Sequence, residues 1–202
     1  MPRRRFADLL LFGVTVGELA ILIHLTPDFT ITDWIYVLQH VIVLGIALTR
    51  PPPTAYDHTV ATSCAVFVAY AYPYAQVIYL NSVPPGDALW PEAGLGLVTL
   101  GTFLSVASLV TLGRFFGVRP ALRGLATKGP YALVRNPMYL AYVLSDIGYN
   151  LQEWSPVCAL LVVAGWVSLV YRIHAEERVL SQDGRWPAYV AAVRYRLVPG
   201  LW

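Results

Sequence analysis

Long apolar runs dominate the pattern of hydrophobic and polar positions along this chain of 202 residues. A helix needs roughly 20 apolar residues to cross about 30 Å of hydrocarbon. Three runs contain no Asp, Glu, Lys or Arg, and three others are shorter or include ionisable side chains. The pattern therefore predicts an all-α integral membrane protein, a bundle of about six membrane segments, five or six, followed by a C-terminal cytoplasmic helix. The expected spans are 6–25, 34–49, 59–80, 93–112, 137–150 and 154–171.

Composition and charge agree with a membrane location. Hydrophobic residues make up 57% of the chain and charged residues 13%, whereas soluble domains usually contain about 25% charged residues. All 14 Lys and Arg fall at the termini or in alternate loops, and the charged residues of the other loops are all acidic. Because cytoplasmic loops keep Lys and Arg, we expect a multi-pass protein with both termini in the cytoplasm. Its basic inner face predicts contacts with membrane lipids rather than with nucleic acid.

Several polar residues lie inside the expected spans. Asp146 makes 137–150 the most polar of them, and it either faces a cavity or a partner, or reaches water at the outer end of a tilted helix. Cys64 and Cys158 both fall within spans, so we expect packing residues rather than a disulfide. Three other ionisable residues are expected to form hydrogen bonds between helices: Glu18, His24 and His40.

The segment 129–139, GPYALVRNPMY, interrupts the apolar pattern at the point where the next membrane helix should begin. Gly129 and Pro130 do not continue a regular helix, and Pro137 disfavours the helical conformation at Asn136. Irregular backbone at a membrane boundary persists only where it is buried in protein or lines a wet cavity. We therefore expect a cavity beside this segment.

A pair of carboxylates, Glu176 and Glu177, follows the last expected span. Adjacent residues on a helix point about 100° apart, so these two side chains cannot have the same role. We expect one of them to face the cavity and the other to pair with Arg172 or Arg178.

Five sequence motifs, taken in order, carry a resemblance to a known family. They are Leu112-Gly-Arg-Phe-Phe, the run 123–131 (RGLATKGPY), the run 134–140 (VRNPMYL), the run 175–180 (AEERVL) and the ending 186–199 (WPAYVAAVRYRLVP). From residue 112 onward the chain resembles the isoprenylcysteine carboxyl methyltransferase and phospholipid methyltransferase superfamily, in particular its small bacterial members. The resemblance covers a little under half of the chain.

The resemblance implies a membrane enzyme that uses S-adenosylmethionine on the cytoplasmic side, in a bacterial inner membrane. It implies that the catalytic residues are Arg196, Glu177 and Arg135, and that no metal is needed. The implied cofactor-binding residues are Gly129, Pro130, Tyr131, Arg135, Asn136, Pro137, Tyr139, Glu176 and Glu177.

Two positions depart from the family pattern. Many members have His where this chain has Asn136, and an amide does not titrate, so a hydrogen-bonding role is expected there. The same Asn-Pro-Met-Tyr run occurs in phosphatidylethanolamine methyltransferases. The run 183–186 (DGRW) also differs from the usual pattern, and we leave it out of the expected site.

The resemblance implies a methyltransferase core at 113–202, preceded by four membrane spans in 1–112 that serve packing and acceptor access. The acceptor is a lipophilic molecule from the bilayer, and a prenylated carboxylate, a lipid amine, a thiol and an isoprenoid all stay open. Two other interpretations remain. One is an NADPH-dependent reductase of the sterol-reductase type, in which a basic cluster would bind the extra phosphate of the cofactor. The other is a non-catalytic scaffold. In a methyltransferase we expect the same basic cluster to contact lipid headgroups. The cluster is Arg114, Arg119, Arg123 and Lys128.

Overall fold

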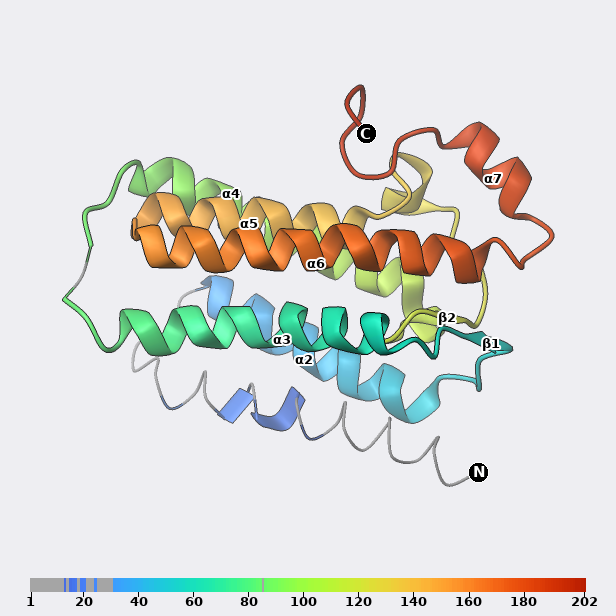
Figure 1. Ribbon diagram of the computed structural model, residues 1–202, viewed down its shortest axis with the longest axis horizontal. Coiled ribbons are helices and arrows are strands. Elements are labelled where there is room, and N and C mark those ends of the chain that lie inside the picture. The colour runs from blue at the N-terminus through green and yellow to red at the C-terminus, as the bar shows by residue number, and fades with distance from the viewer. Residues whose placement is uncertain (1–12, 14, 18, 21–23, 25–30, 85) are drawn as a thin grey trace.

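The computed structural model describes residues 13, 15–17, 19–20, 24, 31–84 and 86–202 (Figure 1). Nearly all of its regular structure is helical, which confirms the predicted all-α membrane fold. Most of the expected span 6–25, with Glu18, lies outside the described residues. The elements are α2 (Ile31–Thr49), β1 (Ala55–Tyr56), α3 (Val60–Leu80), α4 (Pro91–Leu112), η1 (Gly113–Phe115), β2 (Ala121–Leu122), η2 (Gly129–Ala132), α5 (Pro137–Gln152), α6 (Pro156–Leu180) and α7 (Trp186–Ala192).

Three of the described helices are long and apolar enough to cross a membrane: Val60–Leu80, Pro91–Phe115 and Pro156–Leu180. Helix α5 has only 16 residues, and α2 contains a shorter apolar stretch, Val37–Thr49. The total number of spans therefore stays a prediction. Helix α6 continues to Leu180, well past the expected end at residue 171.

The helices pack mainly in two pairs, α4 with α5 and α3 with α6. Small residues bring the backbones of the first pair together, as is common between membrane helices. A Cβ added at Gly94 would lie 2.6 Å from the carbonyl oxygen of Gly148. In the second pair, a Cβ at Gly165 would lie 2.7 Å from the ring of Tyr72. Helix α4 belongs to the expected region 1–112 and α5 to the region 113–202, but the two helices pack against each other. The division into these two regions therefore stays a prediction.

Replacing Gly101 by Leu is expected to destabilise the bundle by about 1–3 kcal/mol, the usual cost of overpacking. A Cβ at Gly101 would lie 2.8 Å from the carbonyl oxygen of Ala141, so the larger side chain separates α4 from α5. Gly96 is the matched control, because no atom lies within 4 Å of a Cβ added there. Thermal unfolding in detergent should show a lower midpoint for Gly101→Leu and little change for Gly96→Leu. Equal effects of the two changes would contradict this packing.

Asp146 joins the two helix pairs in the interior of the bundle. Its carboxylate accepts hydrogen bonds from the Tyr72 hydroxyl at 3.0 Å and from the Trp166 indole at 2.8 Å. The side chain is buried, so the first of the two interpretations holds: Asp146 faces partner helices. Cys64 and Cys158 are free thiols, as expected.

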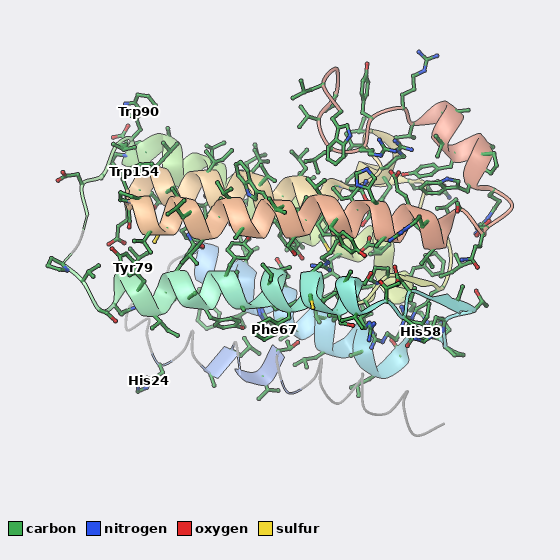
Figure 2. All side chains as sticks on the ribbon, viewed as in Figure 1. His24, His58, Phe67, Tyr79, Trp90 and Trp154 are labelled. Carbon is green, nitrogen blue, oxygen red and sulfur yellow. The ribbon has the colours of Figure 1, made fainter. Side chains whose placement is uncertain are left out.

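Aromatic side chains mark one end of the bundle. Trp90 and Trp154 are 69% and 41% exposed, and Figure 2 shows them near Tyr79 at the same end. Tryptophan and tyrosine are enriched where a membrane meets water. His58, β1, β2, α7 and the C-terminal segment, residues 193–202, lie at the opposite end (Figures 1 and 2).

Candidate active site

A cavity of about 90 Å³ lies at the end of the bundle opposite Trp90 and Trp154. Its walls come from Tyr70 of α3, the last turn of α4, the segment 113–126, η2 and the residues that follow it, the first turns of α5, the last turns of α6, and α7. Five of the residues named by the resemblance line it: Tyr131, Arg135, Asn136, Tyr139 and Glu176. The others lie beside it without contributing to its lining: Gly129, Pro130, Pro137, Glu177 and Arg196.

The irregular backbone expected at 129–136 is present. Gly129 has φ 55°, a conformation that favours glycine, and it begins the short 3₁₀ turn η2. Pro137 is the first residue of α5, where its missing N–H leaves no bond unmade. This start places Tyr139 in the first turn of α5, buried against α6.

Glu176 is the carboxylate that lines the cavity, and it is held from two sides. The Tyr139 hydroxyl donates a hydrogen bond to its Oε1. Arg172, one turn earlier on the same helix, attracts it electrostatically. The Arg172 guanidinium also lies over the rings of Tyr139 and Tyr70, at 5.2 and 5.9 Å from their centroids. Arg172 is therefore a site residue that the family motifs did not identify.

Glu177 points away from Glu176 and joins two other segments of the chain. Its Oε2 accepts a hydrogen bond of 2.9 Å from Arg196 Nε, and its Oε1 lies 3.4 Å from Arg135 Nε. The expectation that it pairs with Arg172 or Arg178 was wrong, because α6 turns it toward the C-terminal segment. Arg178 instead lies 3.6 Å from Asp57.

The chain around Asn136 is bonded to the C-terminal segment as well. The Asn136 backbone N–H and side-chain amide both donate to the carbonyl oxygen of Arg196, at 2.9 and 3.1 Å. The Arg135 N–H donates to the carbonyl oxygen of Tyr195 at 2.9 Å. These bonds and the Glu177 contacts hold the C-terminal segment, η2 and α6 together behind the cavity.

Two tyrosines close another side of the cavity. The Tyr189 hydroxyl donates a hydrogen bond of 2.8 Å to the carbonyl oxygen of Tyr131. Burial raises the pKa of Tyr189 to about 12 and the pKa of Tyr131 above its usual value. Both hydroxyls are therefore neutral at physiological pH, and that of Tyr189 keeps the proton that it donates to Tyr131. The motif at 186–199 contains Tyr189, but motif position alone did not indicate its contact with η2.

One continuous segment, residues 113–126, supplies a large part of the cavity wall, and we call it the cap. Its β2 pairs with β1 in antiparallel register, Ala55 opposite Leu122 and Tyr56 opposite Ala121. These strands were not predicted, because two residues give too short a pattern to recognise.

Three arginines of the cap bind oxygen atoms of the first half of the chain. Arg114 donates to the carbonyl oxygen of Thr49, Arg123 to that of Pro51, and Arg119 to that of Asp57 and to the Ser63 hydroxyl. The distances lie between 3.0 and 3.3 Å. The basic cluster expected at lipid headgroups therefore also holds the cap to the loop that precedes α3.

Comparison with known proteins agrees with the resemblance seen in the sequence. Residues 90–183 match the phospholipid methyltransferase family. This match and the relatives named next support the resemblance to the isoprenylcysteine and phospholipid methyltransferase superfamily. Among its relatives are protein-S-isoprenylcysteine O-methyltransferases A and B of Arabidopsis thaliana, each 30% identical over 95 residues, which is 44% of this chain and 48% of the relative. The matched region thus spans about half the length of these curated relatives.

The region shared with the phospholipid methyltransferase family includes α4, the cap, η2, α5 and α6. It contains the cavity residues of the superfamily motifs up to Leu180, including Glu176, and also Glu177 beside the cavity. Tyr189 and Arg196 lie beyond residue 183, outside that region. Most of the cavity lining therefore lies in the matched region, and Tyr189 of α7 adds to it from outside that region.

Proposed function

We propose that this protein is a membrane methyltransferase that transfers a methyl group from S-adenosylmethionine to a lipophilic acceptor entering from the bilayer. The observation that carries the proposal is the cavity carboxylate Glu176, which is surrounded by aromatic rings and lies within the segment that matches a methyltransferase family. The roles of the individual residues are part of the proposal.

The residues that line the cavity fit the chemistry of the cofactor. S-adenosylmethionine supplies a methyl group on a cationic sulfonium and carries an ammonium and a carboxylate besides. Glu176 would attract the cationic groups, and the rings of Tyr131 and Tyr139 would offer faces to adenine or to the sulfonium. Donors for the carboxylate come from the guanidinium of Arg172 and the side chain of Asn136. The Arg172 Nε is buried and has no hydrogen-bond partner, so one strong donor is available.

Methyl transfer is an in-line displacement in which the protein mainly positions the nucleophile against the methyl group. The chain's task is therefore to hold both reactants and exclude water. A carboxylate or thiolate acceptor needs no base, whereas a protonated amine must first lose a proton. Glu176 is the cavity carboxylate that would accept that proton. Glu177 and Arg196, expected in catalysis, would act from behind the cavity by fixing Arg135 and the C-terminal segment.

The names of the Arabidopsis relatives indicate which acceptor to try first. They are named as O-methyltransferases of protein S-isoprenylcysteine. A prenylated cysteine carboxylate is therefore the first acceptor to test for this chain, followed by lipid amines. The apolar outer surfaces of the helices next to the cavity would let such an acceptor approach from the bilayer.

The orientation that we propose places the cavity, both termini and the cap on the cytoplasmic side of a bacterial inner membrane. The distribution of Lys and Arg supports it. The exposed Trp90 and Trp154 at the other end would then lie at the outer interface.

A reductase that uses NADPH has less support. It would need the basic cluster to bind the extra phosphate, but Arg114, Arg119 and Arg123 already donate to protein oxygen atoms. A phosphate would have to displace these bonds and loosen the cap from the preceding loop.

Methyl transfer to a defined acceptor tests the proposal. The purified protein in proteoliposomes would be incubated with methyl-labelled S-adenosylmethionine and either a farnesylated cysteine derivative or phosphatidylethanolamine. Label in the extracted lipophilic product is expected, at a rate that falls when Glu176 is replaced by Gln. If the sample binds S-adenosylmethionine but no acceptor becomes labelled, the proposed class of acceptor is wrong. If the sample does not bind S-adenosylmethionine, the proposed methyltransferase function is wrong.

A further inference from the structure

The cavity is too small for the ligand that the proposed function requires. Its volume is about 90 Å³, whereas pockets for small molecules usually enclose roughly 300–1,000 Å³. A nucleoside-containing cofactor therefore enters only if one wall moves. The inference below rests on the proposed function, since it concerns how that cofactor gains access.

The cap is the wall whose backbone is best suited to move. It is a continuous segment between α4 and η2, and it contains little regular structure. Glycines with positive φ lie near both of its ends: Gly113 at φ 50° and Gly129 at φ 55°. Glycine absorbs changes of φ and ψ at low cost, and a few element-terminal residues of this kind commonly act as hinges.

On its outer side the cap is bonded to the loop 50–57. The β1–β2 pair, Arg119 and Arg123 all contribute, and Thr54 and Asp57 donate backbone hydrogen bonds to the carbonyl oxygens of Leu122 and Pro120. These bonds join the cap and the loop into one unit. Outward movement of the cap therefore takes the loop 50–57 with it, and it breaks the bonds of Arg114 to Thr49 of α2 and of Arg119 to Ser63 of α3.

On the cavity side, the cap is bonded to α6 by Arg172. Nη2 of Arg172 donates a hydrogen bond of 3.2 Å to the carbonyl oxygen of Val118. Arg172 is 7% exposed, and its guanidinium lies over the rings of Tyr70 and Tyr139. A planar, stacked guanidinium can hold such a bond while it faces Glu176, which a flexible ammonium cannot do equally well.

We propose that the cap is a lid over the methyl-donor site and that Arg172 is the positioning residue that keeps it closed. The Arg172 side chain donates a hydrogen bond to Val118 of the lid and attracts the carboxylate of Glu176 electrostatically. A cationic ligand that binds Glu176 competes with Arg172 for that carboxylate and weakens the closed arrangement. A closed lid reduces the association rate, because only the open fraction of molecules accepts the ligand.

Arg172→Lys tests the lid, because it keeps the charge beside Glu176 and removes the planar bond to Val118. Hydrogen exchange of residues 50–57 and 113–126 would be measured without ligand, and rapid mixing would give the association rate constant for S-adenosylmethionine. We expect faster exchange and an association rate constant higher by about tenfold, the usual size of one lost hydrogen bond to a charged group. Arg185→Lys is the matched control: Arg185 is exposed, pairs with Asp183, and lies outside the cavity lining and both measured segments, so neither quantity should change.

The two possible roles of Arg172, keeping the lid closed and contacting the ligand, give different results. Unchanged exchange together with slower association or faster dissociation in Arg172→Lys would overturn the lid and leave Arg172 as a ligand contact. If wild-type protein binds no S-adenosylmethionine, the proposed function fails, while the exchange measurement still decides whether Arg172 holds the cap.

A cross-link gives a second test that does not depend on the Arg172 variant folding. Leu125 of the cap packs against Val193 of the C-terminal segment. In a background with Cys64 and Cys158 replaced by Ser, Leu125→Cys and Val193→Cys would be joined by a short bismaleimide. Tethering the lid should slow association at least tenfold relative to the same protein without the cross-linker. Equal association rates for tethered and free protein would overturn the proposal.

Discussion

Glu176→Gln is expected to weaken the binding of S-adenosylmethionine roughly 30- to 100-fold. The change keeps the size of the side chain and removes the negative charge at the cavity wall. A hydrogen bond to a charged group contributes about 1.5–3 kcal/mol, and each 1.4 kcal/mol corresponds to a factor of ten in affinity. The cationic groups of the methyl donor would then face Arg172 with no carboxylate to balance it. Titration calorimetry in detergent would measure the loss.

Tyr139→Phe separates the charge of Glu176 from its positioning. This variant keeps the carboxylate and the aromatic face but removes the hydroxyl that donates to Glu176. A smaller loss of about threefold to tenfold in affinity is expected, because the hydroxyl positions the carboxylate and the charge that attracts the methyl donor remains. If Glu176→Gln bound the methyl donor as tightly as the wild type, the assignment of Glu176 to the cofactor site would be wrong.

Glu177→Gln is expected to lower the free energy of unfolding substantially. Glu177 is the shared partner of Arg135, whose side chain is 8% exposed, and of Arg196, which is 32% exposed. Removing one partner of a buried ion pair usually costs about 3–5 kcal/mol, because the other charge stays buried without compensation. Since Arg196 reaches solvent, a cost near the lower end, about 3 kcal/mol, is expected. Chemical denaturation in detergent would measure it.

Asp183→Asn provides the matched control for Glu177→Gln. Asp183 lies 2.6 Å from Arg185, a shorter ion pair than either contact of Glu177, but Arg185 is 65% exposed. Arg185 lowers the pKa of Asp183 to about 2 through hydrogen bonds, yet solvent-exposed pairs usually contribute less than about 1 kcal/mol. Limited proteolysis should release the C-terminal segment in Glu177→Gln and leave it intact in Asp183→Asn. Resistance of both variants would show that Glu177 does not hold this segment.

The helices and the location of the cavity could be predicted from the sequence, for simple physical reasons. Apolar runs near the length needed to cross a bilayer gave α3 and α4 closely, and the start but not the end of α6. The Gly-Pro and Asn-Pro pairs around Tyr131 indicated irregular backbone, and the cavity lies beside it. The separate directions of Glu176 and Glu177 followed from the helical rotation between neighbouring residues.

Contacts between segments far apart in the chain could not be predicted in the same way. The partners of Glu177 depend on how the C-terminal segment folds back, which no local pattern encodes. The loop 50–57 forms part of the site region because cap arginines and a two-residue strand bind it, and neither signal is visible in one sequence. The sequence indicated Arg172 only as a candidate partner for one of the two glutamates, and no local pattern brings it against the ring of Tyr139.

The central claim is that the cavity at Glu176 binds a methyl donor, and direct binding tests it most simply. Titration calorimetry of the purified wild-type protein with S-adenosylmethionine, with NADPH as the comparison ligand and Glu176→Gln alongside, would decide it. We predict micromolar binding of S-adenosylmethionine that Glu176→Gln weakens strongly, and no comparable binding of NADPH. Binding of NADPH without S-adenosylmethionine, in a folded sample, would contradict the methyltransferase assignment and favour a reductase.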